Sequence, residues 1–144
     1  MGNPLLTGMR PHNLSKLLLA ALVSAGCAVA HGADIYVIAN PQVKLSPEDV
    51  REIYLGDKEF SGDVRLAPVD NQAAQAGFVV KALGMNLQRY STLWVKKAFR
   101  DALTPPAVKA TDIEVLEFVK RTRGAVGYVT FVPRDKDVVV VGKF

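Results

Sequence analysis

The stretch Leu45–Gln75 constrains the fold of this chain most, because helix, strand and turn signals follow one another within it. Ser46 suits a helix N-cap, and Pro47 suits the first helical position, where a backbone N–H would have no partner in any case. Two acidic residues then complement the positive end of a helix dipole, and Gly56 supplies a left-handed stop. The pattern predicts a helix over Leu45–Gly56 that Ser46 caps.

The residues after this helix predict a strand and a second helix. Val64–Val69 alternates as a strand does, and Asp70 and Asn71 then lead into a helix that begins near Gln72 and stops at Gly84. The polar residues 57–63 between them are expected to form a solvated connection, with a functional flap as the alternative. This part of the chain is therefore expected to run helix, loop, strand, helix.

The rest of the chain continues the alternation of strands and helices. Ile35–Ala39 is a nearly continuous apolar run, as expected for a strand that is covered on both faces. Further helices are expected from Asn86 and from Thr111 or Asp112, and further strands over Val126–Phe131 and Val138–Val141. The fold class is α/β, a mixed sheet flanked by helices. The last two strands are expected to pair, antiparallel or mixed, because their connector is too short for a helical crossover.

Two of these helices carry apolar side chains at helical spacing: Tyr90, Trp94 and Phe99 in one, and Ile113, Leu116 and Val119 in the other. Both sets are expected to pack in the core, and a ligand platform is the alternative for the aromatic set. The cations near the two helix ends are expected to be solvated and to complement the helix dipoles, and an anionic partner is the alternative for the second group: Lys96, Lys97 and Arg100 in the first helix, and Lys120, Arg121 and Arg123 at the second.

Residues 1–33 have the pattern of a secretory signal peptide: two basic residues, a short apolar run over 17–23, and then small residues. The run is much shorter than the ~20 residues that span a membrane, so a transmembrane helix is the minor alternative. Cleavage is expected after Ala30 or Ala33, which would leave a periplasmic domain over 34–144. Cleavage before Cys27 with lipidation of that cysteine is the other alternative.

The composition of residues 34–144 excludes several kinds of chemistry. Two of the 18 Lys and Arg residues and none of the 14 Asp and Glu residues precede Asp34, so the domain has 16 basic and 14 acidic residues. It contains no cysteine and no histidine, which excludes cysteine nucleophiles, Ser-His pairs, disulfides and the usual zinc sites. The small net charge has no dense basic face, so nucleic acid is not indicated. We expect no enzyme, no cofactor and no metal.

Several segments in order resemble one family: LSPEDVREIYLG, the following PVD, Leu83-Gly84 in a helix, YSTLWVKKAF and RGAVGYVTF. Together they resemble the phosphate-type substrate-binding proteins of ABC transporters, a branch of the type II periplasmic binding proteins, over roughly residues 35–133. Larger members close two lobes on a ligand, and this chain resembles a short member with a single lobe. The resemblance implies solute binding in ABC-type uptake, with phosphate or another oxyanion as ligand and a permease as partner.

The candidate ligand site is the turn before the helix that contains Phe78, where relatives typically have Ser-Gly-Thr followed by Arg. Alignment through Phe78 places Gln72, Ala73 and Ala74 opposite the first three residues and Gln75 opposite the arginine. The side-chain part of the phosphate signature is therefore absent, and backbone N–H groups with the helix dipole remain. The candidate ligand-binding residues are Asp70, Asn71, Gln72, Ala73, Ala74 and Gln75.

Asp70 would repel a dianion unless one ligand oxygen stayed protonated and donated a hydrogen bond to the carboxylate. The alternative is that Asp70 and Asn71 serve only as helix caps.

The sequence is compatible with three classes of function. The first is solute binding, and the second is a periplasmic interaction or sensor module that kept the lobe and lost the ligand. An enzyme comes last, because no motif assigns roles to the scattered carboxylates. A single open lobe leaves an anion hydrated on one side, so weak binding is expected, and a homo-oligomer would restore enclosure.

Overall fold

The computed structural model describes Gly2 and residues 32–144. The unit Gly32–Phe144 is compact, and the fold below is that of this unit. Cys27, Ala30 and nearly all of the predicted signal peptide lie outside the described residues. No helix within the described part is long and apolar enough to cross a membrane.

A five-stranded mixed sheet forms the centre of the unit, in the order β5-β4-β6-β1-β7. The strand β4 is parallel to its neighbours β5 and β6, whereas β1 is antiparallel to both β6 and β7. A separate two-stranded hairpin joins β2 to β3. The strand bounds are β1 Tyr36–Ala39, β2 Phe60–Ser61, β3 Val64–Arg65, β4 Ala67–Asn71, β5 Ala107–Lys109, β6 Ala125–Val129 and β7 Val139–Lys143.

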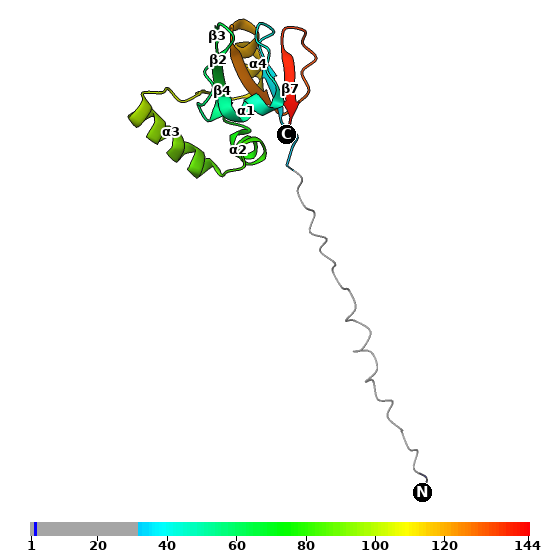
Figure 1. The fold of residues 1–144 in the computed structure, drawn as a ribbon. Helices are drawn as coiled ribbons and strands as arrows, with labels where there is room; N and C mark the ends of the chain where they lie inside the picture. The colour runs from blue at the N-terminus through cyan, green and yellow to red at the C-terminus, as the bar shows by residue number, and fades with distance from the viewer. Residues whose placement is uncertain (1, 3–31) are drawn as a thin grey trace. The chain divides into compact units, whose positions relative to one another are not determined.

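Helices lie on both faces of the sheet, as the sequence predicted (Figure 1). Alternate side chains of β1 point to opposite faces: Val37 packs with residues of α1, α2 and α3, and Ile38 packs with residues of α4. The sheet therefore has a core on each side. The helix bounds are α1 Pro47–Tyr54, α2 Gln75–Leu83, α3 Leu87–Asp101 and α4 Asp112–Arg121.

The predicted start of α1 is confirmed in its main features. Ser46 is the N-cap residue with an extended backbone, and the Asp49 carboxylate accepts a hydrogen bond from the Ser46 amide at 2.8 Å. Gly56 follows the helix with φ of +74°, a conformation that glycine adopts without strain. At the other end of α1, the buried Tyr54 hydroxyl donates to the Val69 carbonyl at 2.8 Å, which ties α1 to β4.

The predicted pairing of the last two strands is wrong, because β1 lies between β6 and β7 and pairs with both. The short connector does exclude a helical crossover, but it still reaches across one intervening strand. The strand β1 occupies the position between β6 and β7 because its side chains are strongly apolar. Val37, Ile38 and Ala39 are at most 1% exposed there, and an edge position would expose them.

Several local expectations also differ from the structure. The strand β5 follows Pro105 and Pro106 and was not predicted, because it is short, lies at the sheet edge and has no periodic pattern. Phe60–Ser61 forms a strand inside the predicted loop. Phe99 is 95% exposed, although it was expected in the core.

The buried stripe of α4 also differs from the prediction. Ile113 is 60% exposed, whereas Val119 is fully buried as predicted, and Val115 is fully buried with it. The reason lies in β6, where Gly127 has no Cβ: a Cβ there would lie 2.5 Å from Val115 Cγ1. The glycine lets these two valines pack directly on the sheet.

Candidate ligand site at the start of α2

The predicted site residues lie where β4 ends and α2 begins. Asp70 and Asn71 are the last residues of β4, residues 72–74 form the turn, and Gln75 is the first residue of α2. This is the carboxyl end of a parallel strand between two parallel neighbours, the edge at which α/β sheets usually bind ligands. The six residues are consecutive, but the structure gives them different environments.

Asp70 is buried, at 2% exposure, and its carboxylate is held by two tyrosines. Its Oδ1 accepts a hydrogen bond from the Tyr128 hydroxyl at 2.8 Å, and its Oδ2 accepts one from the Tyr90 hydroxyl at 3.0 Å. Burial raises the pKa of Asp70 above its ordinary value, and the tyrosine hydrogen bonds oppose that rise. Burial, with the charge of Asp70, also raises the pKa of both tyrosines. The carboxylate is thus stabilised by neutral donors rather than by a cation.

Asn71 is fully buried and connects three elements. Its Nδ2 donates to the Tyr128 carbonyl at 3.0 Å in β6 and to the Asp112 carboxylate at the start of α4. Its Oδ1 accepts from the Ala73 amide at 3.1 Å, which shapes the turn. The structure therefore gives Asn71 the role of a buried junction.

The interpretation of Asp70 and Asn71 as helix caps is wrong. The N-cap residue of α2 is Ala74, which makes no side-chain cap, and the helix begins three residues later than predicted. The shift arises because β4 continues to Asn71 by pairing with β5, with Asp70 opposite Val108.

The backbone amides of the turn are used inside the chain. Gln72 donates to the Lys109 carbonyl at 2.9 Å, Ala73 to the Asn71 side chain, and Ala74 to the Asn71 carbonyl at 3.0 Å. In the described part of the chain, the next three amides, over residues 75–77, donate to no acceptor. These amides form the first turn of α2, where helix N–H groups have no intrahelical partner. The donors open to a ligand therefore lie one step further along than residues 72–74.

A hollow of about 240 Å³ lies beside this first turn, lined by residues 72–74, Ala76, Gly77, Lys81 and Thr130 with three residues near the start of the unit. Lys81 follows Gly77 by four residues and so lies on the same helix face. Its ammonium donates to the Gly32 and Ala33 carbonyls at 3.0 and 2.7 Å. Lys81 is not among the site residues predicted from the sequence. Its spacing from the helix start was the available signal.

Two other hollows lie along α3. One of about 340 Å³ is lined mostly by apolar side chains and includes Asp70, Gln75, Tyr90 and Trp94. The predicted site residues are therefore divided, with Asp70 and Gln75 on this hollow and residues 72–74 on the one beside α2.

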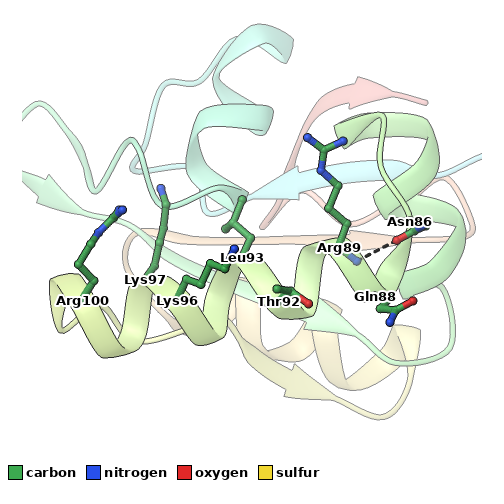
Figure 2. A pocket seen from close by; sticks show the side chains of 8 residues that line it. All are labelled: Asn86, Gln88, Arg89, Thr92, Leu93, Lys96, Lys97 and Arg100. Carbon is green, nitrogen blue, oxygen red and sulfur yellow. Dashed lines mark hydrogen bonds between the residues drawn. The ribbon is translucent and has the colours of Figure 1, made fainter.

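The other hollow, of about 590 Å³, follows the basic side of α3 (Figure 2). Lys97 in its wall is paired with Asp57 at 2.5 Å. In the described residues, no group of three His, Cys, Asp or Glu side chains is placed to hold a metal ion.

Comparison with known proteins gives no matching family model and no matching curated protein. Among solved structures, the chain is similar to a protein from Clostridium perfringens described as a phosphate ABC transporter substrate-binding protein with bound phosphate. The TM-score is 0.56 at 20% identity, over 76% of this chain and 45% of that one. An ABC-type phosphate transport receptor from Vibrio cholerae matches with a TM-score of 0.45 at 18% identity, over 76% of this chain and 46% of that one.

The first likeness establishes the fold. The unit has the α/β fold of phosphate-type substrate-binding proteins, and the chain spans about 45% of the length of the solved neighbour. That extent is what one lobe of a two-lobe protein would give. The predicted fold class and the predicted resemblance to a single lobe are confirmed.

Proposed function

We propose that this chain is a solute-binding protein whose ligand is a small oxyanion, such as phosphate or sulfate, held at the start of α2. The observation that carries the proposal is the hollow in which the free amides of Ala76 and Gly77 meet the Lys81 side chain. Unpaired helix N–H groups and the positive end of the helix dipole favour an anion, and a charge-assisted contact is roughly twice as strong as a neutral one. Lys81 supplies the cation that is missing at Gln75.

The predicted site residues take distinct roles in this proposal. Asn71 shapes the turn through its bond to the Ala73 amide, and the exposed Gln72 carries an amide group that can donate to a ligand. Gln75 lines the hollow along α3 instead. Asp70 faces Tyr90 and Tyr128 and does not line the hollow beside α2, so its repulsion of an anion acts only at longer range.

The biological setting is part of the same proposal. The solved neighbour from Clostridium perfringens is described as a phosphate ABC transporter substrate-binding protein, which supports solute uptake with an ABC permease as partner. The signal pattern in residues 1–33 supports export to the periplasm. The hollow is open and the chain spans under half of its neighbour, so affinity is expected to be weak unless a second copy encloses the ligand.

Thermal melts test the oxyanion site directly. A ligand at ten times its dissociation constant stabilises the native state by about 1.4 kcal/mol, or roughly 5 °C for a domain of this size. We expect phosphate or sulfate to raise Tm of the wild type over chloride at equal ionic strength. Lys81→Gln should lose most of the shift, and Lys136→Gln, an exposed lysine in the loop before β7, should keep it.

The outcomes separate the candidates. A shift that Lys81→Gln leaves intact would place the ligand elsewhere in the fold. No shift of the wild type with any oxyanion would favour the second candidate, a periplasmic interaction or sensor module. That candidate is favoured by the turn itself, because the amides of residues 72–74 are bonded within the chain and the turn is closed without a ligand.

A further inference from the structure

The helix α3 exposes large apolar side chains. Only Tyr90 and Trp94 of its 15 residues are buried. Val95 and Phe99 are 70% and 95% exposed, and they lie four residues apart on the same face. Figure 1 shows α3 at the edge of the domain, with much of its length away from the sheet.

The apolar surface continues from α3 to the sheet edge. Val95 and Ala98 line the hollow of about 340 Å³ together with Pro105 and Val108, and Val108 of β5 is 56% exposed. The exposed patch therefore extends beyond one helix face. Apolar patches of this kind usually mark a surface that contacts a partner or a membrane.

Cations lie in a row next to this face. Arg89, Lys96 and Arg100 are spaced by seven and four residues, so they share one side of α3, and all line the hollow shown in Figure 2. Arg100 pairs with Asp101, the only acidic residue of the helix, at 2.8 Å. Arg89 and Lys96 form no ion pair with any described residue. The row therefore keeps a positive charge that nothing within the domain neutralises.

The combination of charge and apolar surface indicates the kind of partner. An acidic protein surface would satisfy the cations but would leave an almost fully exposed Phe99 without a role. An anionic bilayer satisfies both, because apolar tips enter the boundary of the acyl chains while Lys and Arg remain among the headgroups.

We propose that α3 docks the domain on an anionic phospholipid surface. Val95 and Phe99 enter the interface, and Arg89, Lys96 and Arg100 contact the phosphate headgroups. This inference concerns a different face from the hollow beside α2 and does not rest on the oxyanion proposal.

A tryptophan at position 99 reports contact at α3 itself, whatever the N-terminal segment does. The full chain is used as cells produce it, and Phe99→Trp adds a fluorophore to the single Trp94, which is only 7% exposed. With vesicles of phosphatidylglycerol and phosphatidylcholine, we expect a blue shift of the added emission and quenching by brominated acyl chains. Ile113→Trp is the matched control, at a site that is 60% exposed on α4 between Asp112 and Glu114, and should show neither.

A charge variant tests the headgroup contacts. Each Lys or Arg near an anionic surface contributes to the affinity for the membrane. Arg89→Gln combined with Lys96→Gln should therefore weaken vesicle binding of the Phe99→Trp protein roughly thirty-fold. Added salt should weaken it as well, and vesicles of phosphatidylcholine alone should not bind α3.

Three results would overturn the proposal. One is an unshifted, unquenched Phe99→Trp at saturating anionic lipid, and another is an equal response from Ile113→Trp. The third is displacement of the domain from vesicles by soluble polyglutamate with no dependence on position 99, which would indicate an acidic polypeptide as the partner.

Discussion

Replacing Asp70 by asparagine tests whether the domain really buries a carboxylate without a cation. Burial raises the pKa of Asp70 in the folded state above its ordinary value of 3.8. The folded state then binds a proton up to a higher pH than the unfolded state does. The stabilisation is complete below about pH 4 and is lost as pH rises through the folded-state pKa.

The magnitude follows from the linkage relation. Between the unfolded and folded pKa values of one group, the free energy of unfolding falls by at most about 1.4 kcal/mol per pH unit. Asp70→Asn removes this slope because an amide does not ionise. Relative to the wild type with Asp70 protonated, it should cost about 1 kcal/mol, because it keeps one acceptor for the Tyr90 and Tyr128 hydroxyls and presents an N–H to the other. The wild type should therefore have the higher free energy of unfolding near pH 4, and its difference from Asp70→Asn should shrink as pH rises.

Urea unfolding between pH 4 and 8 at constant ionic strength measures this difference. Asp63→Asn is the control, because its side chain is 91% exposed, and its curve should run parallel to that of the wild type. Tyr128→Phe removes one donor to the carboxylate and should move the loss of stability to higher pH. A gap between wild type and Asp70→Asn that stays constant over this range would refute the reasoning, since it would mean equal pKa values in both states.

Two glycine substitutions test the backbone geometry by the same unfolding assay. Gly124→Ala should cost more than about 3 kcal/mol, because its φ is +81° and a Cβ would lie 2.0 Å from the Arg65 carbonyl oxygen. Gly62→Ala, at φ of +61° with nothing within 4 Å, should cost only about 1 kcal/mol, and equal costs would contradict the clash. Gly127→Ala should cost about 1–3 kcal/mol through its contact with Val115, and Val115→Ala should recover part of that loss in the double variant, whereas strict additivity would argue against the contact.

The sequence predicted the elements whose signals are local. The start of α1 has its cap, proline and acidic first turn within four residues, and the stop of α2 at Gly84 has the left-handed backbone that glycine favours. Elements decided by tertiary pairing were missed or shifted. The strand β5 exists because β4 lies beside it, and that pairing also extends β4 to Asn71 and delays α2.

The environments of the candidate site residues could not be predicted from the sequence. Sequence patterns do not show that the Asp70 carboxylate is enclosed by Tyr90 and Tyr128, since those tyrosines are 20 and 58 residues away. The same holds for the Gln72 amide, whose acceptor, the Lys109 carbonyl, lies on the neighbouring strand β5. A backbone N–H group is free for a ligand only if it does not already donate to an acceptor within the chain. That depends on the folded structure and not on the local sequence.

The structure also changes how the missing arginine is to be understood. When the turn is aligned with that of phosphate-binding relatives, glutamine stands at residue 75 in place of arginine, which suggests that the cation of an anion site is lost. In the fold, the turn amides bond within the chain, so the free donors move to Ala76 and Gly77, and the cation on that helix face is Lys81. An anion responds to N–H groups, a dipole and a positive charge near one point, whichever residues supply them. The proposed site is therefore better defined by its free donors than by the residue types of the turn.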